Sequence, residues 1–180
     1  MSAAGILDPD RTALVIVDLQ ERFAGAIDGW ESIVARAEIL ARAAVLAGLP
    51  TVVTEQYPEG LGPTVPPVAN AVAGFHPLAK KAFPATQADG FDLAGSSQAL
   101  LCGVETHVCV LQTALDLISA GIEVYLVVDA TGSRKAVDRD KAIDRMTLAG
   151  VVPTTVETAG FELLGSADHP SFRDFQGLIK

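Results

Sequence analysis

Residues 99–117 read ALLCGVETHVCVLQTALDL and contain, in order, a strand, a turn and the start of a helix. The first six residues are almost wholly apolar, which is typical of a strand covered on both faces in a parallel sheet. Gly103 allows another backbone to approach closely. From Val108 onward the apolar residues recur at helical spacing, and Gly121 ends the helix.

Cys109 lies at the start of this predicted helix, with Thr106 as the expected N-cap. The N–H groups and the positive dipole end of a helix N-terminus stabilise a thiolate and lower its pKa. The same N–H groups can bind the oxyanion that forms when a thiolate attacks a carbonyl. Cys109 is therefore a candidate nucleophile. The alternative is a small buried hydrophobic residue, which is our interpretation of Cys102 inside the strand.

Strands and helices alternate along the rest of the chain. Further strands are expected at residues 12–17, 50–54, within 75–83, 123–128 and 151–154, and further helices at 30–48, 137–148, 157–164 and 170–179. Residues 55–68, EQYPEGLGPTVPPV, are expected to form a loop, and residues 87–93 are a poor helix candidate. The alternation predicts an α/β fold, a three-layer α/β/α sandwich with a mainly parallel six-stranded sheet, in a single domain over residues 1–180.

Polar side chains follow the ends of the predicted strands. Asp18 follows the first strand, Glu55 the second, Lys80 lies near the end of the third, and Asp129 follows the fifth. The turn that leads to Cys109 follows the fourth strand. Ligands of parallel sheets bind beyond the carboxyl ends of the strands, near the point where the strand order reverses. An acid, a lysine and a cysteine can therefore meet at one edge of the sheet.

Composition excludes several classes of partner. The net charge is −9 and the pI is about 4.7, which argues against nucleic acid or an anionic membrane as a partner. The chain has neither a GxGxxG nor a GxxxxGK[ST] loop, and its three histidines are widely separated. We therefore expect no cofactor and a small-molecule substrate. The hydrophobic content of 49% is high enough that part of it is expected to cover a homo-oligomer interface.

The expected location is the cytoplasm. No apolar run is long enough to span a membrane, and the N-terminal residues MSAAGILDPDR do not resemble a signal peptide. Two cysteines that flank a strand-to-helix turn do not resemble a disulfide framework.

Three separated motifs resemble those of the isochorismatase-like cysteine hydrolase family: LVIVDLQERF at 14–23, KKAF at 80–83 and GVETHVCV at 103–110. The resemblance extends from about Arg11 to the C-terminus. Within the family, the chain most resembles the small stand-alone isochorismatase domain-containing proteins, because of TEQYPEGLGPTV, LLCGVETHVCVLQTALDL and VVDATGSR.

The resemblance implies a catalytic triad of Asp18, Lys80 and Cys109. Asp18 takes the position of the general base and Cys109 that of the nucleophile. Lys80, which precedes Phe83 by three residues, takes the position of the lysine that stabilises the thiolate. The implied reaction is attack on a carboxamide or carbamoyl carbon, release of ammonia or an amine, and hydrolysis of a thioester.

The family also places a cis peptide at Val104–Glu105, which aims the backbone amides of Glu105 and Cys109 at the oxyanion. Nicotinamidases of the family bind a metal through an acid and histidines after the second strand, and this chain has no histidine there. We therefore predict no catalytic metal and do not expect nicotinamide as the substrate. Members that act on isochorismate lack the nucleophilic cysteine, so isochorismatase activity is not expected either.

The remaining candidates each have a second interpretation. Gln20, Phe23, Tyr57 and His107 are predicted to line a substrate pocket. Phe23 and Tyr57 could equally be core or interface aromatics, and His107 could shape the turn. Glu55 could orient a ligand or only stabilise a loop. We also expect Asp129 and Arg134 to form a structural ion pair, and without the motif Lys80 and Lys81 would be interpreted as solvated surface residues.

Two other functions stay open at this point. The first is a catalytically silent domain that binds a metabolite or a partner protein. The second is a redox thiol protein, which we rank lower because no resolving cysteine forms a CxxC motif with Cys109.

Overall fold

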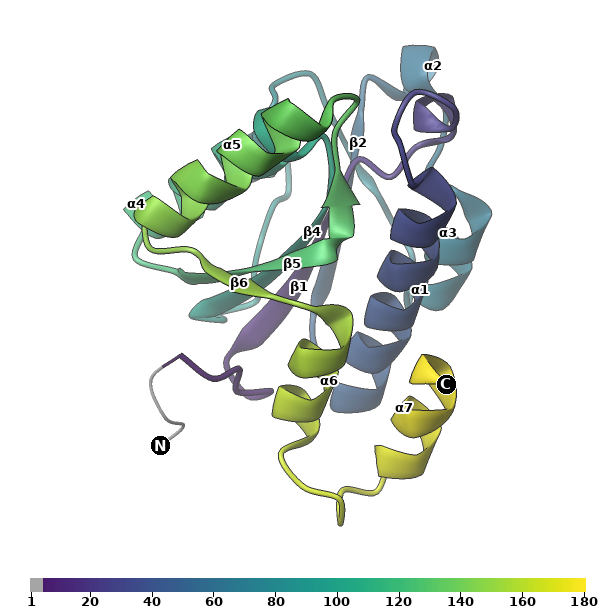
Figure 1. The fold of residues 1–180 in the computed structure, drawn as a ribbon, viewed down its shortest axis with the longest axis vertical. Helices are drawn as coiled ribbons and strands as arrows, with labels where there is room; N and C mark the ends of the chain where they lie inside the picture. The colour runs from purple at the N-terminus through teal and green to yellow at the C-terminus, as the bar shows by residue number, and fades with distance from the viewer. Residues whose placement is uncertain (1–4) are drawn as a thin grey trace.

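A six-stranded parallel sheet forms the centre of this computed structural model, which describes residues 5–180 (Figure 1). The strands are β1 (Thr12–Val17), β2 (Thr51–Gln56), β3 (Leu78–Lys80), β4 (Gln98–Val104), β5 (Glu123–Gly132) and β6 (Val152–Thr154). They are arranged in the order β3-β2-β1-β4-β5-β6, and every neighbouring pair is parallel. The predicted α/β architecture is confirmed.

Helices cover both faces of the sheet. Figure 1 shows α1 (Trp30–Ala47), α3 (Pro66–Ala71), α6 (Val156–Leu164) and α7 (Phe172–Ile179) on one side, and α4 (Leu111–Ser119) and α5 (Ala136–Leu148) on the other. A single turn, α2 (Pro58–Leu61), lies at the carboxyl edge of the sheet. Two short 3₁₀ turns at 21–23 and 85–87 and a π-helical turn at 106–110 complete the structure.

The central strands are buried because both of their faces contact a helical layer. Along β1, Leu14 and Ile16 belong to the core beneath α1, whereas Val15 and Val17 belong to the core beneath α4 and α5. Every residue of β1 and β4 is buried. This explains why these strands are continuous apolar runs rather than alternating ones.

β1 and β4 approach each other closely at their carboxyl ends. Gly103 has φ +118°, and a β-carbon there would overlap the backbone of Val17. Only glycine can therefore occupy this position, as the sequence indicated. The chain turns to opposite sides after these two strands, so the strand order reverses between them.

Prolines explain where the structure differs from the expected loop at residues 55–68. That segment contains α2 and the beginning of α3, and both helices have proline at a first helical position. Proline is favoured there because its fixed φ suits the helix and its missing N–H would be unpaired in any case. The prediction of a loop throughout was wrong.

Two further predictions are corrected around the turn after β4. β5 extends to Gly132 rather than ending at Val128, because its pairing with β4 shifts register and then resumes at Gly103–Thr131. Thr106 does not cap a helix: it begins the π-helical turn, and its hydroxyl bonds that of Thr131.

No helix within residues 5–180 has the length and apolar character needed to span a membrane. The interpretation of the N-terminal sequence depends in part on residues 1–4, which lie outside the described residues.

The C-terminal helix depends on a glycine. Gly160 of α6 has no side chain, and a β-carbon there would overlap the buried Phe175 ring of α7. We predict that Gly160→Ala lowers the free energy of unfolding by about 1–3 kcal/mol, the usual cost of overpacking a core. Chemical denaturation measures this change.

Gly177→Ala in α7 is the matched control, because a β-carbon at Gly177 meets no atom within 4 Å. That change should be neutral or should raise the free energy of unfolding by up to ~1 kcal/mol, as alanine suits a helix better than glycine. Equal losses for both variants would contradict the packing argument.

Candidate functional site

A buried ion pair between Asp18 and Lys80 lies at the carboxyl edge of the sheet. Lys80 Nζ donates to Asp18 Oδ2 at 2.7 Å, and the two side chains are 1% and 0% exposed. Asp18 directly follows β1, and Lys80 is the last residue of β3. The lysine therefore reaches across the end of β2, which lies between these strands. Charges buried in this way must be paired, because removing them from water costs several kcal/mol each.

Side chains of β2 and a backbone carbonyl after β3 complete the hydrogen bonding of the pair. Thr54 Oγ1 donates to Asp18 Oδ1 at 2.7 Å, and Lys80 Nζ donates to Gln56 Oε1 at 2.7 Å and to the Phe83 carbonyl at 2.9 Å. Thr54 and Gln56 are two residues apart and point to the same face of the sheet. Sequence reasoning missed both, although polar residues at alternate positions near the strand end were the available signal.

The backbone at Asp18 is in the left-handed region, with φ +54°. Such a conformation costs a non-glycine residue of the order of 1–3 kcal/mol and persists only where the surroundings enforce it. The Asp18 N–H donates to the Thr54 carbonyl at 3.1 Å. The strand end is thus bent so that the carboxylate faces Lys80.

Cys109 lies in the π-helical turn, buried and close enough to both charges that each acts on its thiol. The pKa of Cys109 is raised to about 12: burial is the largest cause, the Asp18 carboxylate adds to it, and Lys80 acts in the opposite direction. The expectation of a thiolate stabilised in the resting site was therefore wrong. Burial disfavours the thiolate and the Asp18 carboxylate opposes the effect of Lys80, so the thiol is protonated.

The turn itself contains the expected cis peptide at Val104–Glu105. The Glu105 carboxylate accepts hydrogen bonds from Arg134 N at 2.9 Å and Arg134 Nε at 3.0 Å. Asp129 instead lies 3.7 Å from Arg36. The predicted ion pair between Asp129 and Arg134 was therefore wrong, because the register shift in β5 takes Arg134 to the turn.

Two of the predicted pocket residues have structural contacts. Gln20 is fully buried, and its amide donates to the Gly62 carbonyl at 2.7 Å and accepts from the Gln56 N–H at 2.7 Å. It therefore fixes loops rather than offering polar atoms to a ligand. Phe23 is partly buried against the core, with its ring 6.5 Å from that of Trp30.

The other two pocket candidates, Tyr57 and His107, are exposed and half-buried, respectively. Tyr57 is 50% exposed and borders a cavity of ≈ 160 Å³ together with Lys80. His107 Nδ1 and Ser133 Oγ lie 3.0 Å apart and share a hydrogen bond. Glu55 accepts from the N–H and the hydroxyl of Thr64 at 2.7 and 2.8 Å, which agrees with the interpretation that it stabilises a loop.

Comparison with known proteins places this arrangement in a family. The sequence model of the isochorismatase domain matches residues 12–158. Isochorismatase domain-containing protein 2A of Mus musculus is 41% identical over 182 residues, which cover 99% of this chain and 87% of the relative. The chain belongs to the isochorismatase family.

Solved structures of the isochorismatase fold agree. A structure described as the MAR1 ribonuclease from Caenorhabditis elegans has a TM-score of 0.91 and 39% identity, covering 97% of this chain and 92% of that chain. The YcaC gene product of Escherichia coli, described as an octameric hydrolase of unknown specificity, has a TM-score of 0.84 and 25% identity and covers 99% of this chain and 97% of that one. A pyrazinamidase of Pyrococcus horikoshii in complex with zinc has a TM-score of 0.66 and 26% identity, with coverage of 81% and 99%.

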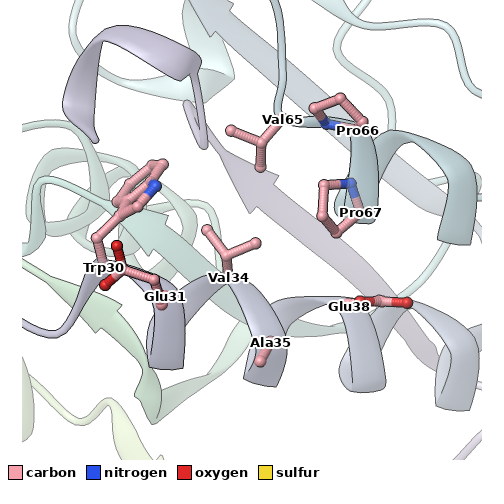
Figure 2. Close-up of a pocket in the computed structure, with 8 residues that line it drawn as sticks. All are labelled: Trp30, Glu31, Val34, Ala35, Glu38, Val65, Pro66 and Pro67. Carbon is pink, nitrogen blue, oxygen red and sulfur yellow. The ribbon is translucent and has the colours of Figure 1, made fainter. Parts of the chain in front are cut away.

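This isochorismatase-family chain also has an apolar cavity of ≈ 400 Å³ between α1 and the start of α3. Figure 2 shows Trp30 and Val34 of α1 pointing toward Val65 and Pro66 across it. None of its lining residues belongs to the cluster of Asp18, Lys80 and Cys109. Within residues 5–180, no three His, Cys, Asp or Glu side chains are grouped so that they could hold a metal ion.

The buried ion pair generates a stability prediction. Replacing Lys80 with methionine leaves the Asp18 carboxylate buried without its cation, so the free energy of unfolding should fall by roughly 3–5 kcal/mol. The double variant Asp18→Asn with Lys80→Met removes both charges and should regain part of that loss. Chemical denaturation at neutral pH measures all three proteins.

The neighbouring Lys81→Met is the matched control. Lys81 is exposed, and only its backbone carbonyl makes a structural hydrogen bond, to Gln56. It should change stability by less than about 0.5 kcal/mol, as surface substitutions usually do. Similar losses for Lys80→Met and Lys81→Met would argue against the ion pair as a structural constraint.

Proposed function

We propose that this chain is a cysteine-dependent hydrolase of a small amide or carbamoyl compound, with Asp18, Lys80 and Cys109 as its catalytic residues. The observation that carries the proposal is a carboxylate, an ammonium and a thiol grouped where the strand order reverses. Family membership supports hydrolysis, and the pyrazinamidase neighbour supports an amide bond as the target.

The first half of the proposed reaction forms a thioester. Asp18 accepts the proton of the Cys109 thiol while the sulfur attacks the carbonyl carbon of the substrate. The carbonyl oxygen becomes an oxyanion, which the backbone N–H groups of Glu105 and Cys109 stabilise. When this intermediate collapses, the C–N bond breaks, and the protonated Asp18 returns its proton to the leaving nitrogen.

The second half returns the enzyme to its initial state. Asp18, again a carboxylate, accepts a proton from water, and the resulting hydroxide attacks the thioester carbon. The C–S bond then breaks, the thiol regains its proton, and the acid leaves. Lys80 stays protonated throughout, because its charge is needed whenever the sulfur or Asp18 is anionic. The sum is one water consumed for each amide cleaved.

The rim of the site is supplied by other elements. We propose that Tyr57, beside Lys80 and half exposed, contacts the substrate. His107 lies in the nucleophile turn and is also proposed to face the substrate pocket. Gln20 and Phe23 are proposed to act indirectly: Gln20 fixes loops and Phe23 packs against the core. None of these proposals requires a cofactor.

Two other functions have an observation in their favour. The protonated thiol and its 6% exposure favour a silent domain that binds a metabolite or partner protein. The name of the nematode relative favours ribonuclease activity. A net charge of −9 opposes the second, because an RNA-binding surface must attract phosphates. We therefore propose a small-molecule substrate.

Assembly and location are also proposed. The octameric E. coli relative supports a homo-oligomer, which accounts for a hydrophobic content of 49%. Both cysteines, Cys102 and Cys109, are free thiols, which suits the reducing cytoplasm.

Ammonia release tests the proposed reaction. A panel of small amides and carbamoyl compounds should contain at least one that yields ammonia, and both Cys109→Ala and Asp18→Asn should reduce that rate by at least ~10³-fold, because each lacks an essential group. Arg42→Gln, which breaks the ion pair with Glu38 on α1 away from the site, should retain the wild-type rate. Ammonia release that survives Cys109→Ala would contradict the proposal, and RNA cleavage by the wild type but not by Cys109→Ala would favour the ribonuclease alternative.

Thiol labelling tests the protonation state. Because the pKa of Cys109 is about 12, its rate of alkylation by iodoacetamide should rise about tenfold per pH unit from pH 7 to 10, without a plateau. Asp18→Asn removes an anion that raises this pKa, so it should accelerate labelling at pH 7, whereas Lys80→Gln should slow it. Mass spectrometry of the Cys109 peptide gives the rates.

Cys102 is the internal control. It is fully buried and its pKa is also raised to about 12, so it should stay unlabelled in the folded protein. A plateau of Cys109 labelling near neutral pH would show that the resting site holds a thiolate and would overturn the assignment of a protonated thiol.

A further inference from the structure

Three consecutive residues of the nucleophile turn are each bound to the segment that ends β5. Glu105 accepts from the backbone and side chain of Arg134, and His107 shares a hydrogen bond with Ser133. Thr106 Oγ1 lies 3.0 Å from Thr131 Oγ1. We name residues 131–134 the brace, because they hold the turn at each of these positions.

The register shift in β5 makes the brace possible. Leu101 pairs with Leu126, but two residues later Gly103 pairs with Thr131. The extra residues of β5 carry Thr131 to the start of the turn, where its hydroxyl donates to the Gly103 carbonyl at 2.7 Å. The Thr131 proton is therefore committed, so Thr106 is the donor in the bond between the two hydroxyls.

Arg134 has the most distinctive place in the brace. Its Nε lies 3.0 Å from both carboxylate oxygens of Glu105, and its own N–H donates to the same carboxylate. The Glu105 side chain is 8% exposed, whereas that of Arg134 is 61% exposed. The buried anion of the turn is thus neutralised from the outside by a single cation.

We propose that Arg134 is a positioning residue of the oxyanion site: by fixing and neutralising Glu105, it allows the turn to stabilise a developing negative charge. This inference rests on the proposed function, because it assigns the Glu105 and Cys109 N–H groups to the oxyanion. Without Arg134, the carboxylate of Glu105 in the nucleophile turn has no counter-ion. A carboxylate there opposes an oxyanion by like-charge repulsion and leaves the direction of the Glu105 N–H less well fixed.

The thiol itself should not sense this change. The charges that act on the pKa of Cys109 are those of Asp18 and Lys80. Loss of Arg134 should therefore affect reactions that develop an oxyanion and spare those that only need the sulfur. Two probes of Cys109 separate these effects.

Acrylamide is the first probe. When the sulfur adds to its terminal carbon, the C=C electron pair moves toward the amide oxygen, which becomes an enolate before the α-carbon is protonated. Methyl methanethiosulfonate is the second probe. Its S–S bond breaks as the Cys109 sulfur forms a new one, and methanesulfinate leaves, so no carbonyl oxygen gains charge. The ratio of the two rates at Cys109 measures stabilisation of the oxyanion.

In Arg134→Gln, the acrylamide rate should fall by about tenfold or more, while the methanethiosulfonate rate stays within about twofold of wild type. The double variant Glu105→Gln with Arg134→Gln removes the unpaired carboxylate and should recover part of the acrylamide rate. Arg42→Gln, which breaks the exposed ion pair with Glu38, is the matched control and should change neither rate.

Each outcome has one meaning. An unchanged rate ratio in Arg134→Gln, or no recovery in the double variant, overturns the role of Arg134. A fall in both rates by the same factor shows a general loss of structure and also overturns it. If wild-type Cys109 adds acrylamide no faster than a thiol in denatured protein, once both rates are divided by the methanethiosulfonate rate, the oxyanion site of the proposed function fails instead.

Discussion

The ion pair between Asp18 and Lys80 is the constraint on which the candidate site depends. It joins the ends of β1 and β3 across β2, and Thr54 and Gln56 of that strand, together with the Phe83 carbonyl, accept or donate its other hydrogen bonds. A buried ion pair contributes little net stability, since hydrophobic residues of similar volume often do as well or better. The pair is therefore better explained by chemistry than by folding.

The same pair determines the state of the thiol. The Asp18 carboxylate opposes the effect of the Lys80 ammonium on the sulfur, and burial is the largest cause, so the pKa of Cys109 rises to about 12. The sulfur is thus protected from electrophiles at neutral pH. Proton transfer to Asp18 becomes favourable only as the sulfur forms a bond to carbon, and Lys80 then stabilises the anion wherever it lies. A resting thiol is consistent with a nucleophile that is activated by its substrate.

The sequence specified the sheet well because its strands are buried on both faces. Residues 12–17 and 99–104 had to be strands, and the polar residues after them had to meet at one edge. The sequence predicted less where contacts between distant residues decide the local structure. Nothing local showed that Thr106 would bond Thr131, or that β5 would shift register and carry Arg134 to Glu105. The pKa of Cys109 was misjudged for the same reason, since it depends on Asp18 and Lys80, which lie far away in sequence.

Comparison of the two cysteines shows what distinguishes a candidate nucleophile here. Both thiols are buried, and both have a pKa raised to about 12, so the pKa alone does not separate them. Cys102 lies within β4, where burial and the Asp129 charge both disfavour the thiolate. Cys109 has both a base that can take its proton and a cation that can stabilise the resulting anion. The arrangement of partners, rather than the resting acidity of the sulfur, is therefore the physical basis for assigning chemistry to Cys109.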